Sequence, residues 1–225
     1  MQLNILVLRV SFLFLDRLSK GFILLMLCVS ASFLSTAQTE SNQVLLVGNF
    51  GSVCMEDSTV LRTTVLPASL DSFKIICFFS NSTSSLTESE ATRVEHFVRS
   101  GGGLYLGSEN WPLQAESNQL TQKLYLKESF GEYDSPLAEI EQESGNLQLE
   151  METIPAGRST VAFPMDYRLR VEAWVADQPL ILSGKVDQGK VIIDGGYSRF
   201  YCDQRSTVTD SLWKAIIAYL AREDL

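Results

Sequence analysis

The sequence predicts an α/β domain in which a mostly parallel β-sheet lies between two layers of helices. Several apolar runs of strand length lack alternation, as expected for strands buried on both faces. One of these runs is followed, within about 35 residues, by an amphipathic helix and another strand, a unit that requires a parallel pair. Residues 136–186 contain stretches that alternate apolar and polar side chains, which predicts an antiparallel β insertion there.

Three strands are predicted in the first part of the domain. Residues 44–49 (VLLVGN) form a continuous apolar run that enters a glycine-rich loop. Residues 59–66 are rich in β-branched side chains, which favour a strand. Residues 73–80 (FKIICFFS) are apolar, aromatic and of strand length, so they predict a strand buried in the middle of the sheet.

Two helices and a strand are expected next. Thr87 and Glu90 have the spacing of a capping box and begin a helix that ends near Ser100, before three glycines. Residues 104–107 (LYLG) are the strand that completes the strand–helix–strand unit. A further helix is expected over residues 113–124.

The last part of the chain predicts antiparallel strands and a terminal helix. Alternation over residues 147–151, and in stretches of 160–175, indicates half-exposed strands. Residues 179–186 and 190–194 are strands joined by Asp-Gln-Gly, a hairpin signal. Apolar residues at helical spacing over residues 207–222 predict an amphipathic helix.

Charged residues in the insertion are interpreted as solvated. Residues 139–143 and 150–152 are acidic, but they lack the spacing of a calcium-binding loop. Arg168, Arg170 and Glu172 alternate along a predicted strand, as on the exposed face of a half-buried sheet. No metal site and no cofactor are predicted.

The N-terminal residues have the pattern of a secretory signal peptide. An apolar run of 14 residues (21–34) follows Arg17 and Lys20, and small residues precede Gln38. A membrane-spanning helix needs about 20 apolar residues, so the run is short for a span. We therefore predict a signal peptide over residues 1–37, a linker over 38–43 and a domain over 44–225. The predicted location is secreted or periplasmic; the alternative is an uncleaved anchor that holds the domain outside the cytoplasm.

Charge and cysteine content narrow the classes of partner. The formal net charge of −9 over 225 residues disfavours nucleic acid, and it disfavours membrane contact other than through an N-terminal anchor. Cys54, Cys77 and Cys202 follow the signal peptide without a CxxC spacing, which argues against a zinc knuckle or redox motif. Cys77 lies in an apolar strand and is expected to be buried. If a disulfide forms, we expect Cys54–Cys202, because both lie just beyond strand ends.

Two segments carry a resemblance to a known superfamily: VRSGGGLYLG (residues 98–107) and PLILSGKVDQGKVIIDGGYSRF (179–200). With the order of elements around them, they resemble the class I glutamine-amidotransferase-like superfamily. The similarity is to its divergent or secreted branches, such as trehalose-utilisation-like proteins, bacterial domains of unknown function and the amidotransferase-like domain of an intraflagellar transport protein. The resemblance covers residues 44–225 and implies a three-layer, flavodoxin-like fold.

The same resemblance locates where catalytic residues would stand. Active members carry a nucleophilic cysteine on the turn after the strand that matches residues 104–107, and a histidine base after the strand that matches 190–194. Glu109 occupies the nucleophile position, and residues 195–199 contain no histidine. The one histidine of the chain, His96, lies on a predicted helix far along the chain from both loops. We therefore expect the catalytic residues of the superfamily to be absent and the domain not to be an enzyme of this class.

The loops beyond the carboxyl ends of the strands could still bind a ligand, since ligands of open parallel sheets bind there. Their amide, carboxylate and aromatic side chains suit a sugar or another polyol. Turns also favour Asn and Ser without any ligand, which is the alternative explanation. The candidate ligand-binding residues are Asn49, Asn81, Ser108, Glu109, Asn110, Tyr197 and Arg199.

Two functions remain open from the sequence. The first is an exported, non-catalytic binding or scaffold domain whose partner is a protein or a small polar ligand. The alternative is a divergent enzyme that acts on a sugar or another small polar substrate, with Glu109 as acid or base. A glycosidase of that kind needs a second carboxylate about 5–10 Å away, for which Asp57, Asp194 and Asp203 are candidates by topology.

Overall fold

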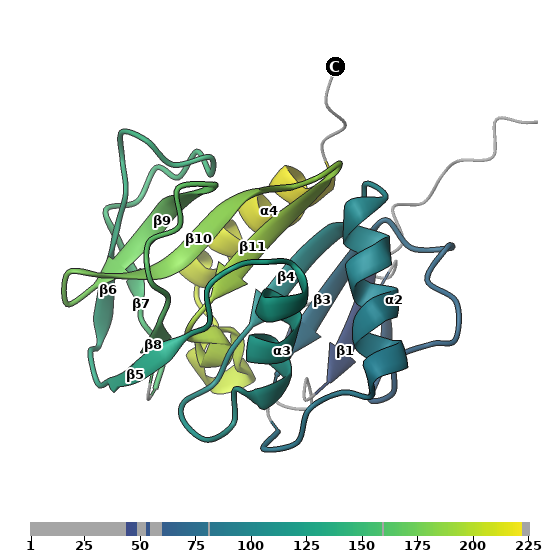
Figure 1. Cartoon of the computed structure of the whole chain (residues 1–225). Coiled ribbons are helices and arrows are strands. Elements are labelled where there is room, and N and C mark those ends of the chain that lie inside the picture. Colours follow the sequence, from purple (N-terminus) through teal and green to yellow (C-terminus); the bar gives the residue numbers. More distant parts are fainter. Residues whose placement is uncertain (1–43, 49–52, 55–59, 81, 159, 222–225) are drawn as a thin grey trace, which may run out of the picture. The chain divides into compact units, whose positions relative to one another are not determined.

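The computed structural model describes residues 44–48, 53–54, 60–80, 82–158 and 160–221. The predicted signal peptide and linker, Asn49, Asn81 and Asp57 lie outside the described residues. The described part is a mixed α/β structure, with a large, mostly parallel sheet of nine strands and three α-helices (Figure 1). The predicted α/β class and mostly parallel sheet are thus confirmed.

Five neighbouring strands form the parallel half of the sheet: β2 (Val60–Thr63), β1 (Val44–Gly48), β3 (Ile75–Phe79), β4 (Gly103–Gly107) and β11 (Gly189–Asp194). Every residue of β3 and β4 is buried, which explains why both read as continuous apolar runs. The register aligns Val44, Ile75, Gly103 and Lys190 in one row at the amino ends of the strands. The opposite ends of β4 and β11 therefore meet at the carboxyl edge.

Four antiparallel strands extend the sheet beyond β11: β10 (Gln178–Val186), β9 (Leu169–Val175), β6 (Leu137–Ile140) and β7 (Thr153–Pro155). They confirm the predicted antiparallel insertion. Strands β5 (Phe130–Tyr133) and β8 (Thr160–Ala162) pair separately. The prediction of a strand over residues 147–151 is wrong, because this segment is irregular.

Helices α2 (Glu88–Arg99) and α3 (Ala115–Lys123) lie on one face of the sheet, and α4 (Thr207–Ala221) lies on the other (Figure 1). Apolar side chains of α2 belong to the same hydrophobic cluster as Ile76 and Leu104, whereas those of α4 belong to the cluster that contains Ile75 and Tyr105. The predicted capping box of α2 is present. None of the helices in the described part is long and apolar enough to cross a membrane.

Glu172 was predicted to lie on an exposed, charged face of its strand, and this prediction is wrong. Its side chain is buried, although Arg168 and Arg170 are exposed as predicted. The Glu172 carboxylate accepts hydrogen bonds from the backbone N–H groups of Asn146 (2.7 Å) and Leu147 (2.9 Å), and from the Ser183 hydroxyl. Burial raises the pKa of Glu172 above its ordinary value, and these hydrogen bonds oppose that shift. Glu172 thus fastens the irregular segment to the sheet.

Candidate functional site

The loops that follow β4 and β11 meet at the carboxyl edge of the sheet. The backbone N–H of Ser108, directly after β4, donates to the carbonyl of Asp194, the last residue of β11, at 2.7 Å. Gly107 permits this contact, because a Cβ atom at this position would lie 3.0 Å from Tyr197. The arrangement brings Glu109 beside the segment Tyr197–Tyr201 that follows β11.

Glu109 is the centre of this site. Its side chain is 7% exposed, and one carboxylate oxygen accepts a hydrogen bond from the Tyr201 hydroxyl at 2.8 Å. Burial is the main cause that raises the pKa of Glu109; the hydrogen bonds from Tyr201 and from the Asn110 N–H oppose it. Burial and the hydrogen bond to Glu109 likewise raise the pKa of Tyr201, so its hydroxyl remains a donor. Glu109 is therefore a largely buried carboxyl group whose position is fixed by a hydrogen bond from the Tyr201 phenol.

Tyr197 lies beneath this pair and has no exposed surface. Its ring packs edge-on against Tyr201, with centroids 5.9 Å apart, and against Phe79 at 5.1 Å. Burial, followed by the nearby Glu109 carboxylate, raises the pKa of Tyr197. Its hydroxyl makes no hydrogen bond of good geometry with the described residues, although it lies close to Tyr201. Tyr197 is therefore a buried support beneath the Glu109–Tyr201 pair.

Arg199 was predicted to bind a ligand, but its guanidinium group is bound by other residues of the chain. The side chain is completely buried and forms an ion pair with Asp194 at 2.9 Å. Its other nitrogens donate to the carbonyls of Pro155 (2.8 Å) and Ala156 (2.7 Å). Arg199 therefore ties the loop after β11 to the end of β7. The Asp194 carboxylate also accepts from Tyr105 at 2.8 Å, which leaves it poorly placed to act as a second catalytic acid.

Ser108 and Asn110 differ in solvent exposure. Ser108 is buried, and its hydroxyl hydrogen-bonds that of Ser117 at 2.8 Å, so it has no base to activate it. Asn110 is half-buried; its amide donates to the Trp111 carbonyl (3.1 Å) and weakly to Glu132 (3.4 Å). Trp111 is 69% exposed. Asn110 and Trp111 are therefore a polar and an aromatic side chain of this turn that solvent can reach.

The Cys54–Cys202 disulfide is present, as predicted for the case that a bridge forms. It joins the loop after β1 to the residue that follows Tyr201. The Cys54 N–H also donates to the Phe200 carbonyl at 3.1 Å, and Val53 forms an antiparallel bridge with Tyr201. Tyr201, the partner of Glu109, lies in the loop that was expected to reach this edge, but it was not among the candidate ligand-binding residues.

In the part of the chain that the structure describes, the cysteines and the histidine that could provide nucleophilic chemistry are bonded, buried or far from Glu109. Cys54 and Cys202 are consumed by the disulfide, and burial raises the pKa of the Cys77 thiol inside β3. His96 lies on α2 and lines a groove at the amino edge of the sheet. Asp203 is exposed. Within the described ranges, no three His, Cys, Asp or Glu side chains are grouped so as to hold a metal ion.

Comparison with known proteins shows similarity in structure alone. No family model matches the chain, and no curated protein matches it. The cytoplasmic protein STM3548 from Salmonella typhimurium is 13% identical, with a TM-score of 0.60 over 80% of this chain and 100% of that one. The mmIFT52 N-terminal domain is 12% identical, with a TM-score of 0.56 over 81% of this chain and 99% of that one.

A putative thua-like protein from Bacteroides uniformis also has a similar structure. It is 10% identical, with a TM-score of 0.53 over 80% of this chain and 91% of that one. At these identities the similarity concerns the fold. The mixed α/β fold of this chain is therefore one that it shares with a thua-like protein and with the mmIFT52 N-terminal domain.

Proposed function

We propose that this chain is an exported, non-catalytic binding domain of the class I glutamine-amidotransferase-like superfamily, with a flavodoxin-like fold. The strand order β2-β1-β3-β4-β11 supports the fold, because it corresponds to the order 2-1-3-4-5 of flavodoxin-like sheets. The observation that carries the proposal is Glu109. It stands on the turn after β4, where the superfamily places its nucleophile, and it is held there by Tyr201.

Among the described residues around Glu109 there is no nucleophile–base pair, which supports a non-catalytic role. Thioester chemistry needs a cysteine and a base within hydrogen-bonding reach. The chain's one histidine lies at the other edge of the sheet, and Cys54 is bonded to Cys202. Ser108 is hydrogen-bonded to Ser117 instead of a base.

A small polar ligand is the partner that the exposed groups favour. Trp111 offers an aromatic face on which a sugar ring could stack, and Asn110 offers an amide beside it. The Glu109 carboxyl group, which is 7% exposed, provides a further polar group behind them. Sites for small ligands combine such apolar walls with a few oriented polar groups. A protein that docks on the same loops is the other form of the proposal.

A divergent enzyme remains the second candidate, because the raised pKa of Glu109 is a property of general acids. The paired-carboxylate form of this candidate has weak support. Asp194 is neutralised by Arg199, Asp203 is exposed, and Asp57 lies outside the described residues. Hydrolysis of a glycosidic bond needs two such carboxyl groups, and of the three candidates neither Asp194 nor Asp203 supports the second role.

Export is proposed on two grounds. The apolar run of residues 21–34, with basic residues before it and small residues after it, has the pattern of a signal peptide. The Cys54–Cys202 disulfide fits an oxidising compartment, where such bonds persist. A secreted or periplasmic domain has both properties.

Ligand-induced changes in backbone amide NMR signals test the binding role directly. The full chain is titrated with trehalose, glucose and mannose. We expect at least one sugar to shift the signals of Asn110 and Trp111. Trp111→Ala should weaken that binding about tenfold or more, because a stacked aromatic face contributes on the order of 1–2 kcal/mol. Tyr167→Ala, at an exposed aromatic residue elsewhere, is the matched control.

Glu109→Gln separates the two candidate functions in the same titration. The amide retains the shape of the side chain and an oxygen that can accept from Tyr201, so a binding domain should keep its affinity within about threefold. If none of the three sugars shifts signals at the carboxyl edge, the small-ligand form of the proposal is wrong. If products of sugar cleavage appear with wild type and not with Glu109→Gln, the non-catalytic role is wrong.

A further inference from the structure

The Cys54–Cys202 disulfide lies next to the residue that holds Glu109 in place. Cys202 directly follows Tyr201, whose hydroxyl donates to the Glu109 carboxylate at 2.8 Å. A displacement of Cys202 therefore acts on the immediate neighbour of that donor. Because Glu109 is only 7% exposed, the position of Tyr201 bears directly on the access of solvent to its carboxyl group.

Backbone hydrogen bonds shape the segment around Tyr201. The Tyr201 N–H donates to the Ser198 carbonyl at 3.0 Å, and the Gln204 N–H donates to the Tyr201 carbonyl at 2.9 Å. Residues 202–204 form the 3₁₀-helix η2, of which no residue is buried. Both hydrogen bonds lie within residues 198–204, so they do not fasten this segment to the rest of the domain.

Val53 and Cys54 attach this segment to the loop after β1. Val53 forms an antiparallel bridge with Tyr201, and the Cys54 N–H donates to the Phe200 carbonyl at 3.1 Å. The disulfide from Cys54 to Cys202 is the covalent part of this attachment. Hydrogen bonds of exposed segments open locally at low cost in free energy, whereas a covalent bond keeps the two segments together when they open.

Solvent reaches this disulfide. Cys202 is exposed and Cys54 is half-buried, whereas the thiol of Cys77 is buried inside β3. Thiol–disulfide exchange requires that an attacking thiolate reach one of the sulfur atoms, so exposed disulfides are the ones that are reduced readily. The bond that attaches Tyr201 is therefore open to reduction while the chain is folded.

We propose that the Cys54–Cys202 disulfide is a redox switch that holds Tyr201 against Glu109, and that its reduction opens the carboxyl edge. In the oxidised chain, Tyr201 keeps the Glu109 carboxyl group largely covered. Reduction lets the segment of Tyr201 and η2 move away, so that solvent and ligands reach Glu109. As regulation of binding, the switch rests on the function proposed above; the movement of Tyr201 does not.

The reductant of the switch is a dithiol. One of its thiolates attacks the sulfur of Cys202, so that a mixed disulfide forms and Cys54 leaves as a thiolate. The second thiolate of the reductant then attacks the reductant's own sulfur in the mixed disulfide and displaces Cys202. The reductant loses two electrons and becomes a disulfide. Cys54 and Cys202 gain these two electrons and, with two protons, become thiols.

Carbodiimide labelling of carboxyl groups, read by mass spectrometry, tests the switch without any ligand. The full chain is labelled as the disulfide, and again after reduction with dithiothreitol and alkylation of the freed thiols. We expect Glu109 to react at least about tenfold faster in the reduced chain, because local opening exposes it. The variant that combines Cys54→Ser with Cys202→Ser should behave as the reduced chain does, without alkylation.

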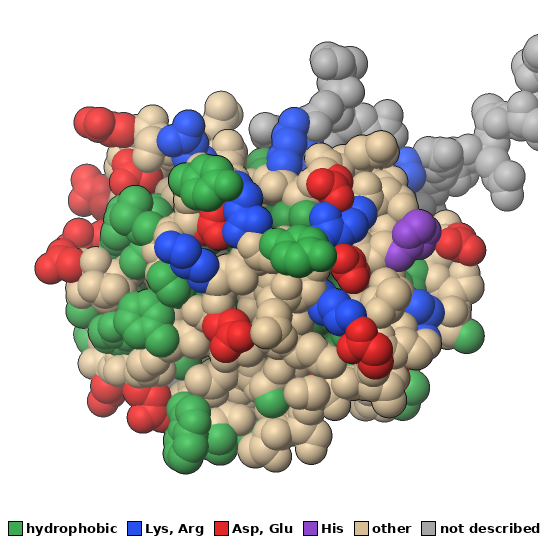
Figure 2. All heavy atoms as spheres, in the orientation of Figure 1, with side chains coloured by type: hydrophobic (Ala, Val, Ile, Leu, Met, Phe, Trp, Pro, Cys, Tyr) green, Lys and Arg blue, Asp and Glu red, His purple; other side chains and the backbone are tan. Residues whose placement is uncertain are grey.

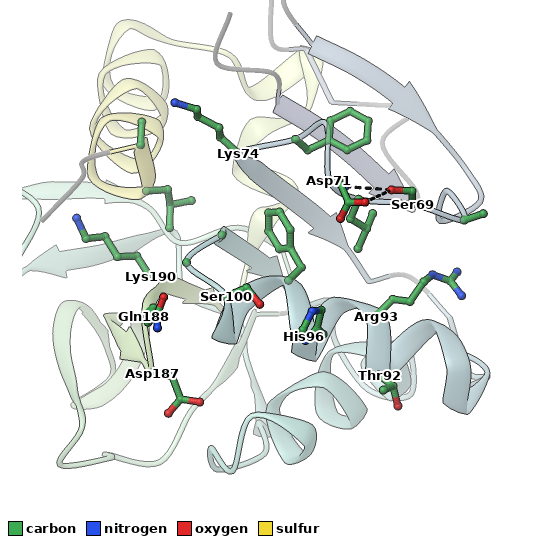
Figure 3. A pocket seen from close by; sticks show the side chains of 18 residues that line it. Ser69, Asp71, Lys74, Thr92, Arg93, His96, Ser100, Asp187, Gln188 and Lys190 are labelled. Atoms are coloured by element: carbon green, nitrogen blue, oxygen red, sulfur yellow. Dashed lines mark hydrogen bonds between the residues drawn. The ribbon is translucent and has the colours of Figure 1, made fainter. Parts of the chain in front are cut away.

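Other carboxyl groups of the chain provide internal controls. Glu172 is 1% exposed and should react slowly in both states, because β9 stays folded. Acidic side chains at the surface, such as those on the face in Figure 2, should react quickly in both states. Asp71 and Asp187, which Figure 3 shows at the groove of the amino edge, are exposed, and their rates should not depend on the disulfide.

Substitutions of tyrosine identify the group that moves. Tyr201→Ala removes the side chain that contacts Glu109, so Glu109 should be labelled quickly whether or not the disulfide is present. Tyr167→Ala, at a side chain that is 97% exposed, is the matched control and should leave the labelling of Glu109 dependent on reduction.

Three outcomes would overturn the proposal. Equal labelling rates of Glu109 in the oxidised and reduced chains would exclude the switch. Fast labelling of Glu172 together with Glu109 after reduction would show that the whole domain unfolds. Slow labelling of Glu109 in Tyr201→Ala would exclude Tyr201 as its cover. A switch that opens while no sugar binds would instead contradict only the small-ligand form of the proposed function.

Discussion

Two opposing effects set the ionisation of Glu109. Burial disfavours the carboxylate, while the Tyr201 hydroxyl and the Asn110 N–H stabilise it, and burial is the larger effect. The folded chain therefore binds the Glu109 proton more tightly than the unfolded chain, whose glutamates have a pKa of about 4.3. The stability that this group contributes is complete below about pH 4.3 and is lost as the pH rises through the higher pKa of the folded state.

Glu109→Gln removes this pH dependence. We expect the free energy of unfolding of the variant, relative to wild type, to increase between pH 4 and pH 7, because wild type alone must ionise a buried acid there. Urea denaturation at both pH values measures the difference, with Glu128→Gln at an exposed position as the control. A relative stability that decreases toward pH 7 would show that the folded pKa of Glu109 is lowered instead.

Asp194 and Arg199 form the most buried ion pair of the carboxyl edge, with neither side chain exposed. Arg199→Met should reduce the free energy of unfolding by about 3–5 kcal/mol, because it leaves the Asp194 charge buried without its partner. Arg170→Met, at an exposed position, should change stability by less than about 0.5 kcal/mol. Chemical denaturation measures both. Equal effects of the two substitutions would contradict the structural role of Arg199.

At the scale of elements, the disulfide joins the loops after β1 and β11. The combined substitution Cys54→Ser and Cys202→Ser should reduce the free energy of unfolding by about 2–5 kcal/mol, since the bond closes a loop of 148 residues. Wild type in dithiothreitol should show the same loss. Chemical denaturation with and without the reductant tests this. An unchanged unfolding midpoint after verified reduction would contradict a stabilising bond.

Elements that depend on local residues were predicted from the sequence, whereas side-chain contacts between distant residues, apart from the Cys54–Cys202 bond, were not. The capping box of α2 joins Thr87 to Glu90, three residues apart, so its pattern was sufficient. Glu172 is buried because Asn146, 26 residues away, and Ser183, 11 residues away, donate to it. No periodicity within β9 reveals such partners.

Residues 147–151 illustrate the limit of alternation as a signal. The pattern predicted a strand, yet the Leu147 N–H donates to the Glu172 carboxylate and so does not pair with a neighbouring strand. Arg199 was assigned to a ligand for a related reason: its loop has the right place, but its side chain turns inward to Asp194. The position of the site followed from topology, whereas the direction of its side chains required the tertiary structure.

At the scale of the whole molecule, the sheet separates two sets of functional groups. Glu109, Tyr197 and Tyr201 lie at the carboxyl edge, and His96 lines a groove at the amino edge. Side chains at opposite ends of the same strands cannot act on one substrate atom. The separation therefore weakens any catalytic role that would pair Glu109 with His96.

Export is a further prediction for the whole chain. If residues 1–37 are a signal peptide, the secreted or periplasmic form should begin at Gln38 and contain the Cys54–Cys202 bond. Mass spectrometry of the N-terminal peptide after expression with native residues 1–37 measures this. An intact Met1 in a membrane fraction would favour the uncleaved anchor. An intact Met1 in the cytoplasm, with reduced cysteines, would contradict export.

We propose that the carboxyl edge has the architecture of an amidotransferase-like site and lacks its chemistry. The most direct test is a turnover assay of the full chain with L-glutamine and with 4-nitrophenyl glucoside, galactoside and mannoside. Wild type, Glu109→Gln and the control Glu128→Gln are compared. We predict no release of ammonia or nitrophenol above the buffer rate for any of the three. Turnover by wild type and Glu128→Gln that disappears in Glu109→Gln would contradict the claim and identify Glu109 as a catalytic acid or base.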